Sequence, residues 1–217
     1  MAKAGRASKK PPQRGRPKLR TDHEQRILIA ASARRLFQDK GYGRTTTDDI
    51  AALCRISKQT LYRLFPGKPA LFAAIVEQHR QSMLALPDDY DDLPLDRALE
   101  KIFKIGIDQA AEEERVTLLR VVMLETHQYP ELSDILRRHG ADKSRADLAQ
   151  WLAKQSENGS INIDNPDRAA RLLMDMIFGG MVFKSMTVDS LPWPDAEERD
   201  DHVRRCVSVF LNGVRSR

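Results

Sequence analysis

Residues 46–71 read TTDDIAALCRISKQTLYRLFPGKPAL, and their pattern indicates how the N-terminal part of the chain folds. It contains two short segments with apolar residues at three- and four-residue spacing, which is typical of helices that bury one face. The threonine run Thr45–Thr47 can cap the first segment, Ser57 can cap the second, and Pro66-Gly67 ends it. Two short helices joined by a tight turn have the organisation of a helix-turn-helix, in which the second helix enters the major groove of DNA.

Two longer helices flank this stretch. Asp22 can cap a helix that ends at Lys40-Gly41, and a further helix from Lys68 carries Phe72, Ile75, Val76, His79 and Met83 on one face. The acidic, proline-flanked residues 87–94 form a natural break. We therefore predict a three-helix helix-turn-helix domain within residues 21–85, followed by a second domain over residues 95–217.

From about Asp22 to Val76 the sequence resembles the DNA-binding domain of the TetR family of transcriptional regulators. The matching positions are Thr46, Ile50-Ala51, the turn Arg55-Ile56-Ser57, Leu61-Tyr62, Phe65, Lys68 and Leu71. Two positions depart from the family pattern, because Arg55 stands where glycine is usual and Gln59 where a small residue is usual. Arg55 must therefore adopt the backbone that the turn demands, which we expect to be left-handed.

The resemblance implies which side chains meet DNA. It makes Thr46, Tyr62 and Lys68 phosphate contacts, and it places four further residues at base edges or their flanks, beside the capping Ser57: Lys58, Gln59, Thr60 and Arg63. Their chemistry agrees, since Gln bonds adenine bidentately, Lys and Arg bond guanine, and Thr offers a hydroxyl and a methyl group. The alternative is a trihelical core without a DNA role.

The first twenty residues form a basic arm, with eight basic residues and no acidic one. With almost nothing apolar to bury, this arm is expected to be disordered until it meets a polyanion. Its Arg14-Gly15-Arg16-Pro17 segment resembles an AT-hook core, in which arginines follow the narrow minor groove of A·T-rich DNA. We predict DNA contacts from Arg14, Arg16, Lys18 and Arg20, with a flexible leader as the alternative.

The second domain reads as helical throughout, which makes the chain all-α with about nine helices. The segment from Val116 to His127 is almost continuously apolar and is expected to be buried all round. A helix from Pro130 reaches about Gln155, a later helix between residues 169 and 182 is apolar on more than one face, and residues 203–214 carry a clean amphipathic stripe.

The family resemblance implies that the last two helices form a four-helix bundle with a second copy of the chain. This would explain the helix that is apolar on more than one face, whose alternative is a central core helix of a monomer. The candidate dimer residues are Leu173, Met176, Gly180, Val203, Val207 and Phe210.

Methionines and aromatic residues in the second domain suggest an adaptable apolar cavity for a small effector. The candidates are Phe103, Met123, Met174 and Phe178, and His127 is one turn beyond Met123 as the polar group that would orient a ligand. The alternative is an ordinary filled core.

Several classes of protein are disfavoured. The chain has no apolar run of membrane-spanning length and no apolar segment behind its basic start, so we expect a cytoplasmic protein. The two cysteines lie in apolar patterns, the five histidines lack metal-ligand spacing, and no phosphate loop or nucleophile turn occurs, so no cofactor, metal or catalysis is expected. We predict a repressor that binds an inverted repeat with A·T-rich flanks as a homodimer and is released by a small apolar effector. An architectural A·T-binding protein is the alternative.

Overall fold

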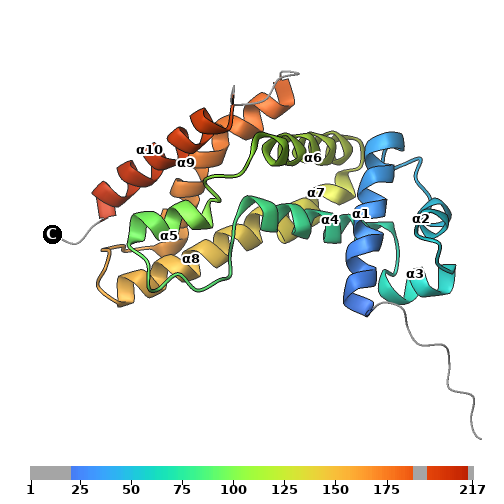
Figure 1. Ribbon diagram of the computed structural model, residues 1–217, viewed down its shortest axis with the longest axis horizontal. Coiled ribbons are helices and arrows are strands. Elements are labelled where there is room, and N and C mark those ends of the chain that lie inside the picture. Colours follow the sequence, from blue (N-terminus) through green and yellow to red (C-terminus); the bar gives the residue numbers. More distant parts are fainter. Residues whose placement is uncertain (1–20, 188–194, 215–217) are drawn as a thin grey trace, which may run out of the picture.

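The computed structural model describes residues 21–187 and 195–214, without the side chains of residues 180–187. The described residues form helices and connections without a β-strand, so the all-α prediction is confirmed. The bounds are α1 Asp22–Lys40, α2 Thr47–Cys54, α3 Lys58–Leu64, α4 Lys68–Met83, α5 Leu95–Ile102, α6 Gln109–Gln128, α7 Pro130–Leu136, α8 Asp142–Glu157, α9 Pro166–Thr187 and α10 Ala196–Val214. Helices α1 to α3 form one end of the molecule, and the last turn of α10 lies at the other (Figure 1).

A side chain that caps the helix marks the start of each of the first three helices. Helix α1 is capped by Thr21 in a reciprocal box with Glu24, so Asp22 is the first helical residue and its prediction as the cap was wrong. Thr46 caps α2 in the same way with Asp49, and the Ser57 hydroxyl accepts the N–H of Thr60 at the start of α3. These two caps are confirmed, and each satisfies an N–H that the helix itself leaves without a partner.

The turn between α2 and α3 depends on the backbone of Arg55. This residue ends α2 with φ 54° and ψ 45°, and its N–H bonds the carbonyls of Ala51 and Ala52. The expected left-handed conformation is therefore confirmed. It costs a residue with a Cβ about 1–2 kcal/mol relative to glycine, which the bonds of the turn must offset.

The core of the N-terminal part extends into the second half of the chain. Residues of α1 to α4 form one buried cluster, and Leu118 and Val122 of α6 and Leu132 of α7 belong to the same cluster. The division into domains at residues 21–85 and 95–217 stays a prediction, and apolar packing crosses it. A displacement of α6 or α7 therefore acts directly on the core that supports α2 and α3.

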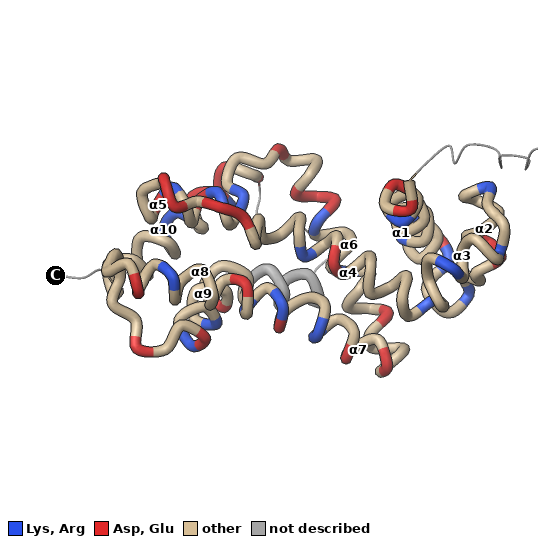
Figure 2. The backbone as a smooth tube through the Cα atoms, turned by 90° about the horizontal axis from the view of Figure 1, so that it is seen from below, with Lys and Arg blue, Asp and Glu red and all other residues tan. Residues whose placement is uncertain are grey.

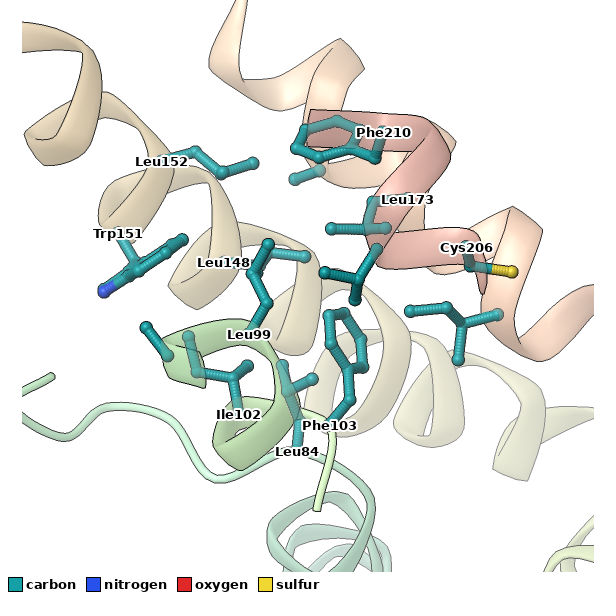
Figure 3. Packing of buried hydrophobic residues seen from close by; sticks show 14 of the residues in the cluster. Leu84, Leu99, Ile102, Phe103, Leu148, Trp151, Leu152, Leu173, Cys206 and Phe210 are labelled. Atoms are coloured by element: carbon teal, nitrogen blue, oxygen red, sulfur yellow. The ribbon is translucent and has the colours of Figure 1, made fainter. Parts of the chain in front are cut away.

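A second core occupies the C-terminal part (Figure 3). It gathers buried residues from α5, α8, α9 and α10, among them Leu99, Leu148, Leu173 and Phe210, together with Phe103 directly after α5. Helix α6 lies at its margin, and Leu124 is 62% exposed, so the prediction that this segment is buried all round was wrong. Its apolar side chains are divided among the N-terminal core, solvent and the cavity described below.

The helix predicted from Pro130 to about Gln155 is interrupted by one π-helical turn at Arg137–Ala141, between α7 and α8. Gly140 lies in this turn against α4, and a Cβ there would stand 3.3 Å from Val76 Cγ1. Turns of this kind are rare and often occur at functional sites. The small residue lets the turn approach α4 closely.

Candidate DNA-binding and effector sites

The short helix α3 separates its buried residues from its exposed ones. Leu61 and Leu64 anchor it in the core, which leaves its opposite side to solvent. The exposed residues there are Lys58, Gln59, Tyr62 and Arg63, whereas Thr60 is half-buried with its hydroxyl 2.9 Å from that of Ser57. The structure thus brings Lys58, Gln59 and Arg63, three of the four predicted base-reading residues, to one exposed face, at the end of the molecule formed by α1 to α3, where Figure 2 marks basic segments. Their role in DNA binding stays a prediction.

The two cations on this face are already paired with carboxylates from other helices. Lys58 Nζ lies 2.7 Å from Asp48 Oδ2 on α2, and Arg63 forks across both oxygens of Asp22 at 2.6 and 3.0 Å. The pKa values of Lys58 and Arg63 are raised, chiefly by these hydrogen bonds. A DNA base or phosphate must therefore compete with a carboxylate for each cation.

The residues assigned to phosphate contacts also hold the domain together. The Thr46 hydroxyl bonds Asp49 within the capping box of α2, and the Tyr62 hydroxyl lies 3.1 Å from that of Thr47. The Lys68 ammonium donates to the carbonyl of Tyr42 at 2.8 Å. Each of these polar groups is near DNA only if the family arrangement holds, so the three assignments remain predictions. Arg14, Arg16, Lys18 and Arg20 of the arm lie outside the described residues.

The loop between α1 and α2 connects the helix-turn-helix part to α6. The backbone N–H of Tyr42 donates to Glu125 Oε1 at 2.9 Å, and the Tyr42 ring lies 5.4 Å from that of Tyr129. A Cβ on Gly43 would overlap the Tyr129 hydroxyl, so glycine is required for this approach. These contacts hold the C-terminal end of α6 against the loop whose Tyr42 carbonyl also accepts a hydrogen bond from Lys68.

A cavity of about 340 Å³ lies between α4, α6, the π-helical turn and α9. Its wall is mostly apolar, and the size falls within the roughly 300–1,000 Å³ range of small-molecule sites. Met123, Met174 and Phe178 line it, so three of the five predicted effector residues are brought together. Further apolar lining residues are Val76, Met83, Leu84, Leu119, Leu136, Gly140 and Ala141, and polar ones are Arg80, Ser133, Arg137 and Ser144.

Two predicted effector residues lie elsewhere. Phe103 is fully buried in the C-terminal core, with its ring 5.8 Å from that of Phe178, so it supports the wall from behind. His127 is exposed on the last turn of α6 and does not line the cavity, so its assignment as the orienting group was wrong. The helix carries it past the cavity into solvent.

His79 of α4 is a polar group of this wall that the sequence pattern did not assign to a site. It lines the cavity, is only 8% exposed, and neither ring nitrogen has a hydrogen-bond partner among the described residues. Burial, reinforced by the cations Arg115 and Arg34, lowers its pKa to about 4, so the ring is neutral at pH 7. The signal was available, since a histidine stood on the apolar face predicted for this helix.

Most of the residues predicted to form the dimer interface lie inside their own chain. Leu173, Val203, Val207 and Phe210 are buried in the core of their own chain, so they are not free to face a partner. Met176 is half-buried, with its carbonyl 3.1 Å from Nε2 of His202 on α10. Gly180 belongs to the part of α9 whose surroundings lie outside the described residues. Among the side chains of these two helices that the structure describes, the large apolar ones left exposed are instead Leu172 and Val209, at 58% and 64% exposure.

Cys54 and Cys206 are both free thiols, and burial raises the pKa of Cys206. Within residues 21–187 and 195–214, the side chains described include no cluster of His, Cys, Asp and Glu suited to a metal ion. Over the same part of the chain, the helices are too short or too polar to cross a membrane.

Comparison with known proteins agrees with this architecture. Residues 29–75 match the family described as bacterial regulatory proteins of the tetR family, and residues 97–213 match the C-terminal domain described as AefR-like transcriptional repressor. An HTH-type transcriptional regulator of Mycobacterium tuberculosis is 31% identical over 170 residues, which are 77% of this chain and 79% of that protein.

Solved structures show the same fold. A TetR-family regulator from Mesorhizobium loti has a TM-score of 0.66 at 23% identity, covering 90% of this chain and 98% of that one. A protein named flavonoid-responsive regulator FrrA has a TM-score of 0.60 at 22% identity, covering 90% of this chain and 99% of that one. The chain therefore belongs to the TetR family of transcriptional regulators, and it is a DNA-binding regulator rather than an enzyme.

Proposed function

We propose that the protein is a repressor that binds a palindromic operator as a homodimer and leaves it when a small apolar molecule occupies the cavity beside α4. The observation that carries this proposal is the position of the cavity. Helix α4 supplies Val76, His79 and Met83 to its wall, and only residues 65–67 separate the start of this helix from the end of α3. A ligand that moves α4 therefore moves the helix that reads DNA.

A ligand changes DNA affinity only if it binds one arrangement of the domains better than the other. The cavity offers such a difference, because its wall combines α4 with α6, the π-helical turn and α9. Closure around a ligand would draw these elements together, and the contacts of Tyr42 with Glu125 and Tyr129 would carry the shift to the loop before α2. The name of FrrA, a protein of the same fold, describes it as responsive to a flavonoid, which supports effector control as a mode of action for such a chain.

The dimer would pair α9 and α10 of each chain through Leu172 and Val209. Both residues expose large apolar side chains to solvent. Their helices are neighbours, since Cys206 Sγ of α10 lies 3.5 Å from the Met176 carbonyl of α9. Burying them against a second copy removes this cost. Leu172→Asp and Val209→Asp should shift the sedimentation coefficient to that of a monomer, whereas Leu124→Asp on α6 should not.

The test of effector control compares a variant that fills the cavity with a variant of equal bulk outside it. Operator fragments selected from random DNA serve in a gel-shift assay, and apolar compounds are screened by thermal unfolding. An effector should raise the melting temperature and weaken operator binding. Met174→Trp should abolish both responses and retain DNA binding, whereas Leu124→Trp should retain the responses. If compounds that stabilise the protein leave operator binding unchanged, the domain is not an effector switch.

DNA reading by α3 has a separate test. Gln59→Ala should relax base preference at one position by about 1–3 kcal/mol, the usual worth of a bidentate hydrogen bond to a base, while Lys68→Ala should weaken binding to all sequences alike. Two recognition helices related by a two-fold axis should protect half-sites about one DNA turn or more apart. Equal losses of affinity for operator and random DNA with Gln59→Ala would contradict its assignment. A footprint over many A·T-rich sites would favour the architectural alternative.

A further inference from the structure

A second cavity, of about 240 Å³, lies where α1 meets α4 and α6. Arg34 of α1, His79 of α4 and Arg115 of α6 line it, together with Lys104 and Ile107 from the connection between α5 and α6. It is separate from the apolar cavity, although His79 contributes to both walls. The DNA-binding part and the C-terminal part of the chain therefore meet around this space.

The wall of this cavity carries more positive than negative charge. Three cations, Arg34, Lys104 and Arg115, line it with a single carboxylate, Glu114. Glu114 pairs with Arg34 at 2.6 Å. Arg115 bonds Glu112 at 3.1 Å, but that carboxylate also lies 3.4 Å from Arg199. Among the side chains that the structure describes, the ammonium of Lys104 has neither an ion pair nor a hydrogen bond.

Burial lowers the pKa of two of these cations, and for Arg115 the carboxylates of Glu112 and Asp200 offset only part of that effect. Burial and then the nearby Arg115 lower the pKa of Lys104. Burial lowers the pKa of Arg115 to about 10, which still leaves it charged at neutral pH. His79 adds a polar ring that is 8% exposed and has no hydrogen-bond partner in the described part of the chain. A buried polar group left without a partner is costly, so a ligand that supplies one is favoured.

We propose that this cavity binds a small organic carboxylate. One carboxylate oxygen accepts a hydrogen bond from the Lys104 ammonium, and the other accepts from the single N–H of the neutral His79 ring. Arg115 adds positive charge beside them, and the apolar body of the ligand packs on Ile107 and Leu118. A bare inorganic anion fits less well, because the cavity is several times the ~30 Å³ that one water molecule occupies in the liquid.

This second ligand would act at the junction of the two parts of the protein. Arg34 belongs to α1, whereas the lysine and the second arginine belong to the C-terminal part. An anion between them adds attraction across the junction and competes with Glu114 for Arg34. This inference does not depend on an apolar effector in the larger cavity.

The experiment uses the full-length protein, with sodium benzoate as the carboxylate and benzamide as its neutral counterpart of nearly equal shape. Thermal unfolding and titration calorimetry are measured at constant ionic strength, with sodium chloride and sodium phosphate as further ligand controls. Benzoate should raise the melting temperature, and benzamide, chloride and phosphate should not. Equal stabilisation by benzamide or chloride would overturn the proposal, and stabilisation by phosphate equal to that by benzoate would overturn the organic ligand class.

Variants locate the site. Lys104→Met should weaken benzoate binding at least about tenfold, since it removes a charge-assisted hydrogen bond. Lys101→Met, on the exposed side of α5, should bind benzoate like the wild type. Glu114→Gln removes the carboxylate that repels the ligand and should tighten binding, which gives a result that loss of folding cannot imitate. The proposal fails if Lys104→Met binds benzoate as the wild type does, or if Glu114→Gln weakens binding.

Discussion

The titration of His79 should make the stability of this protein depend on pH in a specific window. Its folded pKa of about 4 lies below the ordinary value of 6.5, because burial and the cations Arg115 and Arg34 disfavour the charged ring. Above pH 6.5 the ring is neutral in both the folded and the unfolded state, so it contributes no penalty. As the pH falls below 6.5 the unfolded state takes up a proton that the folded state refuses, and stability is lost until the pH reaches about 4.

The magnitude follows from the pKa difference. One pKa unit corresponds to about 1.36 kcal/mol, so the ~1.5 units between the ordinary pKa and pH 5 cost about 2 kcal/mol of the free energy of unfolding. Urea unfolding followed by circular dichroism at pH 8 and pH 5 measures this loss, at one protein concentration because a dimer gains stability with concentration. Carboxylates titrate over the same range, so the comparison is with a variant.

Between pH 8 and pH 5, the free energy of unfolding of His79→Leu should fall by about 2 kcal/mol less than that of the wild type, whatever the stability of the variant at pH 8. His127→Leu, which replaces an exposed histidine, serves as the matched control and should retain the wild-type difference. If His79→Leu lost as much stability between pH 8 and pH 5 as the wild type, the ring would already be charged in the folded protein. The conclusion that the buried His79 ring is neutral in the folded protein would then be wrong.

Three further predictions concern the DNA-binding part. Arg55→Gly removes a left-handed backbone cost of about 1–2 kcal/mol from the folded state, but glycine also stabilises the unfolded state by about 0.4–1 kcal/mol of chain entropy. Urea unfolding should therefore find this variant as stable as the wild type or slightly more stable. A clear loss of stability would contradict strain at this turn. Asp48→Asn frees Lys58 and removes a negative charge beside DNA, so gel shifts should show tighter binding to operator and random DNA alike, most at low salt, whereas Asp39→Asn on α1 should have little effect. Deletion of residues 1–20 should reduce the magnitude of the slope of log K against log salt by about 0.9 for each phosphate that the arm neutralises, and an unchanged slope would make the arm a passive leader.

Local chemistry determined much of the N-terminal part from the sequence alone. A cap, an apolar spacing and a proline-glycine stop act within one or two turns of a helix, so Thr46, Ser57 and the end of α3 before Pro66 could be predicted without knowing the partners of each helix. The left-handed turn at Arg55 could be anticipated for the same reason. The cap of α1 was missed by one residue, because Thr21 and Asp22 are both good capping residues and only the geometry of the box with Glu24 separates them.

Tertiary packing decided which faces of the C-terminal helices meet. Helix α9 is apolar on several sides, and periodicity alone does not distinguish the side that meets its own core from the side that would meet a second copy. The structure places Leu173 inside and its neighbour Leu172 outside, because α8 and α10 cover the side of α9 that carries Leu173 and leave Leu172 uncovered. The same reason separates the two histidines: His79 lies where α1 and α6 pack against α4, and His127 lies on the exposed side of the last turn of α6. A side chain's chemistry is local, but its burial depends on which helices lie over it, and that depends on the packing of the whole chain.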